Sequence, residues 1–543
     1  MTKTMPIIIE NKIEHKLFWS GNKIKPKVKF VSVESGITAL GFRKVAAIAR
    51  SLNSETDICF IPVNNLYSFI SHIFPNKKTG FGEYDAKLVA SYLANADIIC
   101  FSTMTASAEQ TKAIISQIKN INPDTFILLG GVHSIIYPED AIQMADAICL
   151  AEGEIPFEAF YRNFEGKKDF ASTPGMWFNT PSGVKKNAPP PLNANDVLSN
   201  FPHLYDGLDC KIYDLDKKEM RDINQKDYAA FHGLTHRTLW SIGCPFSCTY
   251  CANDVFIGLD KKYTKLRYPS VDYIIDELLL AIENHPHIST IAFYDDNFIA
   301  LPLDVISEFA TKYKEKVGLP FVVFGVHPNI VSKEKIDLLS SVGMNRVRMG
   351  IQSGSAKMLE FYQRRTSQDK IRTAVSILAK AANEYNQIPP AYDVISDNPL
   401  ETRADILESL NFFYALDRPY TLTIFSLRVF PGTQLWNFFA NHPEYGNPQE
   451  INSSYLDTRK SMGNVLLYML GTFKPPKIIW NFLLQYVRGY DEPQPDRTTL
   501  HFICRNIYLI KRAVDHLLRF DFTVIVGKWT WYVWKTGLVG KKR

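Results

Sequence analysis

The sequence predicts an α/β protein with two parallel-sheet domains and a helical C-terminal extension. Between residues 27 and 163, five short apolar runs alternate with stretches whose apolar residues recur every three or four positions. A second series, with six such runs, occupies 237–430. Beyond residue 450 the pattern becomes helical and strongly aromatic. At 543 residues the chain is too long for one compact core, so two or three domains are expected.

The first series predicts a doubly wound, Rossmann-like parallel sheet. Its strands are KVKFVSVE, DICFIPV, DIICFST, TFILLGG and DAICLAEGE, and helical patterns such as 39–52 and 107–121 lie between them. Buried-type strands that alternate with helices are typical of this architecture. Ligands of such sheets bind beyond the carboxyl ends of the strands, where this chain places small and polar residues.

The second series predicts a partial (β/α)6 barrel, because six strands are fewer than the eight of a full barrel. Its strands are TLWSIG, ISTIAFYDD, PFVVFGV, RVRMGIQ, AYDVIS and TLTIFSLRVF, with helices such as 271–284 and 367–386 between them. The predicted segments are an N-terminal extension (1–26), a first domain (27–165), a Pro/Asn-rich linker (166–235), the barrel (236–450) and a C-terminal extension (451–543).

Three cysteines crowd the loop after the first barrel strand, in the stretch SIGCPFSCTYCAND. A disulfide needs two cysteines and a closed zinc site needs four ligands, yet the next histidine, His285, lies far beyond in a predicted helix end. A cubane [4Fe–4S] cluster held by three thiolates leaves one iron open to a small ligand. A redox pair, a partial zinc knuckle and a chance grouping in a core are the alternatives.

The spacing Cys244-x3-Cys248-x2-Cys251, with Tyr250 before the last cysteine, resembles the radical S-adenosylmethionine (SAM) superfamily. The resemblance implies that the three cysteines hold a [4Fe–4S] cluster, whose open iron chelates the amino and carboxylate groups of SAM. Reduction of the cluster then cleaves SAM to methionine and a 5′-deoxyadenosyl radical. It also places Tyr250 near the adenine.

Two further strand ends extend the resemblance. YDDN (294–297) stands where the family contacts the SAM amino group, and Asp295 and Asp296 replace the more usual Gly-Gly-Glu. A carboxylate there would accept hydrogen bonds from the ammonium of SAM. MGIQSGS (349–355) resembles the contact to ribose and carboxylate, with Gln352 and Ser353 as candidates. For each motif alone, an ordinary strand-end turn is the alternative.

The first domain resembles the cobalamin-binding domain that precedes the radical SAM domain in one large subclass. LLGGVHSIIYPED (128–140) and LAEGEIPFEAF (150–160) carry the likeness, because a Gly-Gly turn lets backbone approach a bulky flat ligand. The cobalamin-contact candidates are Ser102, Thr103, Thr105, Gly130, Gly131, Val132, His133, Glu152 and Gly153.

The first domain departs from the histidine-ligating type of cobalamin domain. That type has Asp-x-His-x-x-Gly after its first strand, where this chain reads ESGITALG (34–41). We therefore expect no protein histidine on the cobalt, and expect His133 to contact the periphery of the cofactor or cap its loop. A domain that has lost the cofactor is the alternative.

The resemblance implies an enzyme, most often a methyltransferase that acts on an unactivated carbon or a phosphorus centre of a small molecule. In that subclass one SAM methylates cobalamin, and a second yields the radical that abstracts a substrate hydrogen. The electron comes from a donor such as flavodoxin or ferredoxin. Two alternatives stay open. One is an oxidative cyclase, because the anaerobic magnesium-protoporphyrin monomethyl ester cyclase has the same two-domain architecture; the other is a non-catalytic cobalamin or iron–sulfur sensor. YDVISDNPLET (392–402) departs from the more usual Gly-x-Pro-Gly-Glu-Thr and marks a branch to which the sequence assigns no particular chemistry.

The basic character of the chain lies in its C-terminal extension. Residues 451–543 hold fifteen Lys and Arg against six Asp and Glu, a net charge of +9, and the whole chain is only +5. Asp521, Lys528 and Lys535 recur every seven residues and would form one narrow stripe on a helix over 520–543. The expectation is an aromatic helix in a membrane interface, aided by Lys541, Lys542 and Arg543; packing on the protein's own core is the alternative.

The cysteines and the charge pattern indicate the cellular compartment of the protein and the kinds of partner it can have. The remaining cysteines (Cys59, Cys100, Cys149, Cys210 and Cys504) stand singly, several in apolar runs, as reduced buried cysteines do. The N-terminus lacks the apolar core of a secretory signal. We expect a cytoplasmic protein, with peripheral contact to the inner face of the membrane if the tail binds lipid, which would favour a lipophilic substrate. No aromatic–basic pattern for nucleic acid is present.

Overall fold

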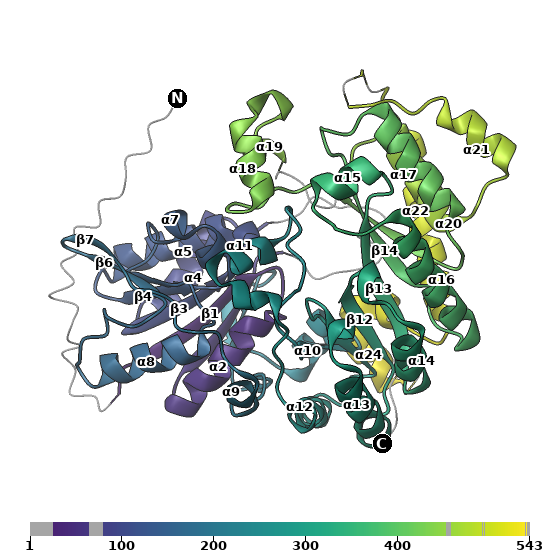
Figure 1. The fold of residues 1–543 in the computed structure, drawn as a ribbon. Coiled ribbons are helices and arrows are strands. Elements are labelled where there is room, and N and C mark those ends of the chain that lie inside the picture. The colour runs from purple at the N-terminus through teal and green to yellow at the C-terminus, as the bar shows by residue number, and fades with distance from the viewer. Residues whose placement is uncertain are drawn as a thin grey trace. The chain divides into compact units, whose positions relative to one another are not determined.

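The computed structural model describes residues 25–64, 80–451, 458–490, 492–493, 495–537 and 539. Almost all of the predicted N-terminal extension, and Lys541, Lys542 and Arg543, lie outside the described residues. The chain forms two compact units (Figure 1). Of the described residues, 25–64, 80–193 and 201–228 form the N-terminal unit, and 194–200 and those from 229 onward form the C-terminal unit.

The N-terminal unit is built on a mainly parallel sheet, as predicted. Its five central strands lie in the order β5-β4-β3-β1-β2 and are parallel. They are β1 (Val28–Glu34), β2 (Asp57–Pro62), β3 (Ile98–Thr103), β4 (Phe126–Gly130) and β5 (Ala147–Cys149). From β1 the chain winds first to β2 and then back past β1 to β3. A sheet that reverses its winding in this way binds ligands at the switch point, here between β1 and β3.

Helices cover both faces of this sheet (Figure 1). The principal ones are α2 (Leu40–Leu52), α4 (Glu83–Leu93), α5 (Ala108–Ile121), α6 (Val132–Ile136), α7 (Pro138–Ala141) and α8 (Glu154–Glu165). On one face of the sheet, buried residues of α4 and α5 share a core with β1 and β3. On the opposite face, α2 contacts α8, and the aromatic residues there include Phe30 and Phe157. Because helices cover both faces of the sheet, side chains on both faces of each strand are buried, and the strand sequences are therefore nearly continuous apolar runs.

The stretch 166–235 is not an unstructured linker, so that interpretation is wrong. It contributes the hairpin β6 (Met176–Thr180) and β7 (Gly183–Lys186), which extends the sheet beyond β5. It also contributes β8 (Lys211–Asp214) and β9 (Glu219–Asp222), which extend it beyond β2. These strands are only four or five residues long, and β7 and β9 are polar and largely exposed, so the stretch lacks the longer apolar runs on which the sequence prediction relied.

The C-terminal unit contains a six-stranded parallel sheet, and the predicted partial barrel is confirmed. Its strands follow one another in sequence order and all pair in parallel. They are β10 (Thr235–Thr238), β11 (Thr290–Phe293), β12 (Phe321–Val326), β13 (Met344–Gln352), β14 (Ala391–Ser396) and β15 (Thr421–Ser426). The first strand ends at Thr238, where TLWSIG was expected to begin, so most of that run already belongs to the loop.

One core joins the outer face of this sheet to its helices. The connecting helices are α11 (Ala252–Leu259), α12 (Val271–Asn284), α13 (Leu303–Lys316), α14 (Lys333–Ser341), α15 (Ala356–Phe361), α16 (Gln368–Glu384), α17 (Arg403–Ala415), α18 (Gln434–Asn441) and α19 (Pro448–Ile451). Alternate strand residues such as Phe293, Val323 and Ile424 pack against helix residues such as Leu278 and Phe309. The intervening strand residues face the inside of the partial barrel.

The C-terminal extension packs on this unit as a set of helices: α20 (Met462–Thr472), α21 (Lys477–Leu484), α22 (Thr498–Leu517), α23 (Thr523–Val526) and α24 (Thr530–Lys535). Helices α20 and α22 lie side by side at edge strand β15 (Figure 1). The hydroxyl of Tyr508 donates to the carbonyl of Leu422 there, and Nη1 of Arg346, on β13, lies 3.0 Å from Nε2 of His516. An edge strand of a sheet is usually covered in this manner.

The predicted single helix over 520–543 is wrong. The chain there forms two short helices joined by a turn at Gly527, whose φ of 40° breaks the helix. Asp521 is buried and receives a hydrogen bond from His516, so it does not belong to a solvent-facing charged stripe. Val526 and Val539 pack against Leu234, just before β10. No helix among the described residues is long and apolar enough to cross a membrane.

Candidate cofactor sites

The three-cysteine loop runs from β10 to α11 at the carboxyl end of the barrel sheet. Gly243 has a φ of +111°, and a Cβ there would lie 2.7 Å from the carbonyl oxygen of Lys265, so only glycine fits this turn. The amide of Cys244 donates to the carbonyl of Tyr263 over 3.1 Å, and the amide of Cys251 donates to that of Cys248 over 3.0 Å. The loop therefore has a defined backbone course.

The three thiols suit an iron–sulfur cluster better than a single metal ion. All are free of disulfides and lie close enough for their charges to interact. No three His, Cys, Asp or Glu side chains in the described part of the chain converge to hold a single metal ion. In a cubane each thiolate binds a different iron, so its ligands need not converge on one point. Burial raises the pKa of Cys244 to about 11 and that of Cys251 to about 12, so iron would have to displace protons on binding.

Asp295 and Asp296, predicted to contact SAM, brace the cysteine loop. The Asp295 carboxylate accepts hydrogen bonds from the amides of Trp240 and Ser241 and from the Ser241 hydroxyl, at 2.5–3.2 Å. Burial raises its pKa to about 6. Asp296 accepts from the Tyr263 hydroxyl at 3.1 Å, and hydrogen bonds from the Asn253 side chain and the Gly243 amide favour its charged form against the burial that raises its pKa.

The neighbouring Asn297 completes this strand end. Its side chain is buried, and neither its amide nitrogen nor its amide oxygen has a hydrogen-bond partner among the described residues. A buried amide without partners is costly, which makes it a candidate for a ligand contact. Behind it, Gly325 has a φ of +69°, and a Cβ there would lie 2.1 Å from the carbonyl oxygen of Asp295. Strand β12 can approach this turn closely only because residue 325 is glycine.

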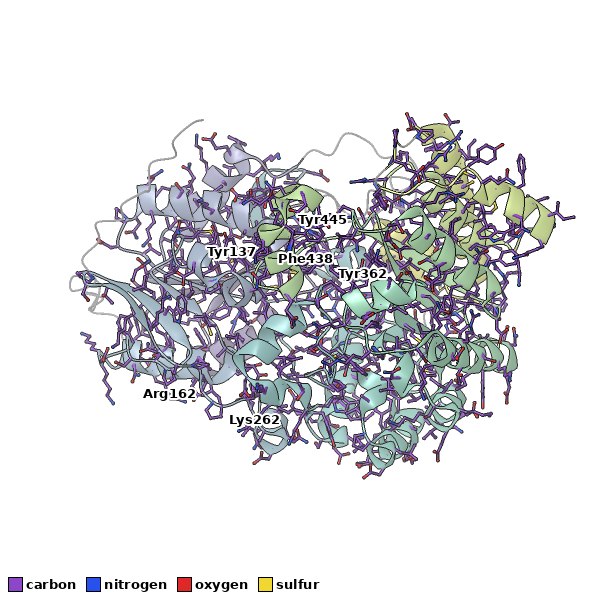
Figure 2. The ribbon with its side chains drawn as sticks, turned by 45° about the horizontal axis from the view of Figure 1, so that its top comes forward. Tyr137, Arg162, Lys262, Tyr362, Phe438 and Tyr445 are labelled. Atoms are coloured by element: carbon purple, nitrogen blue, oxygen red, sulfur yellow. The ribbon has the colours of Figure 1, made fainter. Side chains whose placement is uncertain are left out.

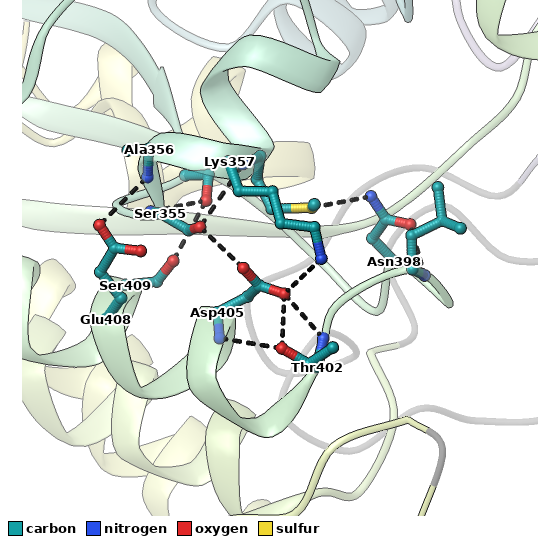
Figure 3. Close-up of polar contacts among 11 residues, drawn as sticks. Ser355, Ala356, Lys357, Asn398, Thr402, Asp405, Glu408 and Ser409 are labelled. Carbon is teal, nitrogen blue, oxygen red and sulfur yellow. Dashed lines mark hydrogen bonds and ion pairs between the residues drawn. The ribbon is translucent and has the colours of Figure 1, made fainter.

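The turn after β13 is tied to the start of α17 (Figure 3). Ser353 lies 3.1 Å from the hydroxyl of Ser409, and Ser355 donates to Asp405 over 3.1 Å. Asp405 also closes a capping box with Thr402 at the start of the helix. Gln352 has a φ of 76°, a left-handed conformation that is uncommon outside glycine and is often found at functional sites. Of the two predicted residues, Ser353 is engaged within the protein, and Gln352 carries the unusual backbone.

Tyr250 lies against the segment that follows α15. Its ring contacts Tyr362 (labelled in Figure 2) edge to face, with 5.2 Å between ring centroids. Its hydroxyl accepts a hydrogen bond from Nη1 of Arg364 at 3.2 Å, and burial raises its pKa. The amide of Thr249 donates to the carbonyl of Tyr362 over 3.1 Å, so this segment and the cysteine loop are joined through backbone as well as side chains.

The inner face of the barrel sheet carries aromatic rings and arginines. Tyr294 stacks on Phe324 with 4.3 Å between centroids. The Arg348 guanidinium lies 5.5 Å from the centroid of Phe324 and 5.2 Å from that of Phe425, and its Nε donates to Asp393 over 2.7 Å. Phe324, Arg348, Asp393 and Phe425 come from β12 to β15, Tyr294 directly follows β11, and all five are partly exposed. They form a mixed aromatic and charged lining of the kind that orients a polar substrate.

A small cavity of about 40 Å³ lies at the carboxyl end of β14. It is lined by Ser353, Val394, Ile395, Ser396, Asp397, Glu401, Ile406, Ser409, Leu410, Phe413, Ser461, Gly463, Asn464, Leu467, Arg488 and Tyr490. The Asp397 carboxylate accepts hydrogen bonds from the Tyr490 hydroxyl, the Asn464 amide group and the backbone of Arg459. Burial, with the charges of Asp397 and Asp405, raises the pKa of Glu401 to about 8.

The predicted cobalamin contacts gather at the carboxyl edge of the N-terminal sheet. Gly130 ends β4, and Gly131 has a φ of +92°; a Cβ there would lie 2.6 Å from the carbonyl oxygen of Thr103. This turn brings β3 and β4 into backbone contact and leaves a surface free of side chains at its glycines, which fits a flat ligand. Ser102 and Thr103 end β3, and the Thr103 hydroxyl is hydrogen-bonded to that of Thr111.

His133 follows Val132 in the first turn of α6, and both of its ring nitrogens are engaged. Nδ1 lies 3.3 Å from the hydroxyl of Thr105, and Nε2 lies 3.0 Å from a carboxylate oxygen of Asp140. The side chain is buried and acts here as a brace between the turn after β3, α6 and α7. Glu152, whose carboxylate accepts from the amide of Asn193, and Gly153 stand at the start of α8, beyond β5.

Comparison with known families agrees with both sites. Residues 26–161 match the B12 binding domain family, and residues 239–413 match the Radical SAM superfamily. The chain is a B12-binding radical SAM enzyme. Its implied cofactors, a [4Fe–4S] cluster, SAM and cobalamin, are those predicted from the sequence.

Curated and solved proteins of similar sequence or fold point the same way. This B12-binding radical SAM enzyme is 24% identical over 361 residues, 65% of this chain and 71% of the relative, to the "Uncharacterized methyltransferase PH0819" of Pyrococcus horikoshii. It shares the fold of the radical SAM methyltransferase TsrM from Kitasatospora setae (TM-score 0.58, 16% identity, 77% of this chain and 76% of that one). It also shares the fold of the cobalamin-dependent SAM radical enzyme OxsB (TM-score 0.62, 15% identity, 95% and 84%).

Several residues of these sites carry no signal in the sequence. Arg364 belongs to an ordinary QRRTS stretch, and Asn464 and Tyr490 lie beyond the barrel in the C-terminal extension. Asn297 belongs to the YDDN motif, in which the two acidic residues are the stronger candidates for the ammonium of SAM. What identifies them is burial and hydrogen bonding, which depend on residues distant in the chain.

The raised pKa of Glu401 predicts a pH-dependent stability. Because the folded protein binds this proton more tightly than the unfolded chain, stability falls as the pH rises from about 4.5 towards 8. We expect Glu401→Gln to be similar to wild type near pH 5 and more stable by roughly 4 kcal/mol near pH 8.5, because a shift of one pKa unit corresponds to about 1.4 kcal/mol. Urea unfolding at the two pH values measures this. Glu360→Gln, at an exposed position, is the control and should show no such difference.

A difference between Glu401→Gln and wild type that does not change with pH would contradict the assignment of a protonated Glu401 in the folded protein.

Proposed function

We propose that this enzyme is a cobalamin-dependent methyltransferase that acts on an unactivated carbon or a phosphorus centre of a small molecule. The observation that carries the proposal is the pairing of a three-thiolate loop with a second domain whose sheet edge suits a corrinoid. The similar proteins PH0819 and TsrM are both described as methyltransferases, which favours methyl transfer over other radical chemistry.

The chain's own residues hold and orient these cofactors. Cys244, Cys248 and Cys251 would ligate the cluster, and Tyr250, Asn297 and Gln352 would contact SAM. When bound, the cluster and SAM supply a carbon radical and cobalamin carries a methyl group. The buried, hydrogen-bonded surroundings of the cysteine loop exclude water from the place where a radical would form.

Asp295 and Asp296 keep the loop in place while the cluster changes charge. Electrons come from an external one-electron donor such as flavodoxin or ferredoxin. The runner-up function is oxidative ring closure, because the resembled oxidative cyclase combines the same two domains.

Anaerobic reconstitution with iron, sulfide, cobalamin, SAM and a reductant tests the proposal without knowledge of the substrate. A methyltransferase should form both 5′-deoxyadenosine, from radical cleavage, and S-adenosylhomocysteine, from transfer of the SAM methyl group to cobalamin. Cys248→Ala should abolish 5′-deoxyadenosine formation, because the cluster loses a ligand. Cys504→Ala, in α22, is the matched control and should retain it.

The two readouts separate the candidate functions. 5′-Deoxyadenosine without S-adenosylhomocysteine would contradict methyl transfer and favour the cyclase. Cleavage of SAM by Cys248→Ala at the wild-type rate would overturn the assignment of the cluster ligands.

We further propose that α22 docks the enzyme on an anionic membrane surface. Leu500, Ile503, Ile507, Ile510, Val514 and Leu517 recur at three- and four-residue spacing and are 39–51% exposed. They form one apolar face, continued by Leu518 and Phe520. Monomeric proteins rarely leave such a stripe uncovered.

Charge favours a lipid over a protein partner for this face. The extension carries a net charge of +9, which complements an anionic headgroup layer, and exposed aromatic residues such as Trp529 and Tyr532 suit the interface. Docking of this kind would give the enzyme access to a substrate that resides in the membrane.

Vesicle co-sedimentation tests this contact. The enzyme should bind phosphatidylglycerol-containing vesicles and be released by high salt, and Ile507→Asp/Ile510→Asp should weaken binding at least tenfold. Leu280→Asp, at a comparably exposed position on α12, is the control and should bind as wild type does. Dimerisation through α22 without vesicle binding, or unchanged binding by the double variant, would contradict the proposal.

A further inference from the structure

Arg364 is a buried arginine beside the cluster ligands that no step above has used. It lies between α15 and α16 and is 7% exposed. Its Nη1 donates to Sγ of Cys248 over 3.4 Å and to the Tyr250 hydroxyl over 3.2 Å, and its Nη2 donates to the carbonyl of Gly350. A Cβ at Gly350 would lie 2.9 Å from Nη2, so glycine at that position leaves room for the guanidinium.

The backbone of Arg364 is fixed by several contacts at once. Its amide donates to the carbonyl of Leu359 over 2.9 Å, and its own carbonyl oxygen lies 3.2 Å from Nε2 of His327. His327 in turn stacks on Phe246 of the cysteine loop, with 3.7 Å between centroids. The flanking residues Gln363 and Arg365 have φ of 49° and 46°. Such strained backbone persists only when surrounding contacts stabilise it, and it is frequent at functional sites.

The electrostatic surroundings of Arg364 call for a negative partner. Of its polar contacts, the closest are a thiol, a phenol and a carbonyl, and the nearby Asp393 carboxylate already pairs with Arg348. Its Nε is buried without a hydrogen-bond partner among the described residues. A buried cation is costly unless it is paired. A cubane with three thiolate ligands is negatively charged, and reduction adds one more negative charge.

We propose that Arg364 raises the reduction potential of the cluster held by Cys244, Cys248 and Cys251. Its positive charge and its N–H···S hydrogen bond to Cys248 stabilise the reduced, more negative state over the oxidised one, because hydrogen bonds to ligand sulfur and net charge both set the potentials of iron–sulfur clusters. Arg364 is thus a positioning and tuning residue. This proposal rests on the cluster assignment of the proposed function, and it adds the residue that tunes the reduction potential of that cluster.

A potentiometric titration of the reconstituted cluster, followed by electron paramagnetic resonance with and without SAM, measures this directly. Arg364→Gln should lower the equilibrium constant for reduction at least tenfold, which is about 59 mV for a one-electron couple. Arg364→Lys should fall between Gln and wild type, because it keeps the charge and loses the fork of donors. Arg365→Gln, at the exposed neighbour, is the matched control and should leave the potential unchanged.

Tyr250→Phe supplies a second variant that keeps the arginine–sulfur contact. Its potential should equal or exceed that of wild type, because Nη1 then has Cys248 as its remaining partner. A loaded Arg364→Gln cluster with the wild-type potential would overturn the proposal. So would loss of iron from both Arg364 variants while the apo-proteins melt as wild type does, which would assign Arg364 to cluster assembly instead. If the wild-type protein itself assembles no cluster, the proposed function is contradicted, rather than the role of Arg364 alone.

Discussion

Two hydrogen-bonded carboxylates on one strand end, the buried Asp295 and the half-buried Asp296, hold the cysteine loop, and the rest of the site depends on them. Asp295 fixes the entry of the loop through Trp240 and Ser241, and Asp296 fixes it near Gly243 and through Tyr263. Buried carboxylates are stable only when hydrogen-bonded, and here half of the donors are backbone amides of the loop itself. These hydrogen bonds define the backbone course of the loop and so help to determine where the three thiolates lie.

The sequence revealed most of the fold and the cluster ligands because both depend on local patterns. Apolar runs with β/α alternation predicted both sheets, and the spacing of three cysteines within eight residues predicted a cluster with an open iron. The sequence predicted less where a strand is polar or where the structure depends on contacts between residues far apart in the chain. The short strands β6 to β9 have no long apolar run, and the tail 520–543 reads as a regular helix until Gly527 and the buried Asp521 are placed in three dimensions.

The roles of individual site residues were the least predictable. Asp295 and Asp296 were expected to bind the SAM ammonium, yet their carboxylates are occupied by the loop, and Asn297 beside them has an amide without partners. Arg364 meets Cys248 across 116 positions of sequence, a contact that forms only when the barrel domain folds. The C-terminal extension, which the sequence marked as a basic tail, completes the barrel: it covers edge strand β15 and reaches Asp397 through Asn464 and Tyr490.

The central claim is that three cysteines hold the cluster and leave one iron for SAM. Electron–nuclear double resonance on the reduced, reconstituted enzyme with SAM labelled with ¹⁵N at its amino group and ¹⁷O at its carboxylate measures this most directly. The account predicts hyperfine coupling of both labels to the cluster, as expected for direct chelation of one iron. A cluster that assembles fully but shows coupling to neither label would contradict it, because the fourth iron would then be occupied by a different ligand.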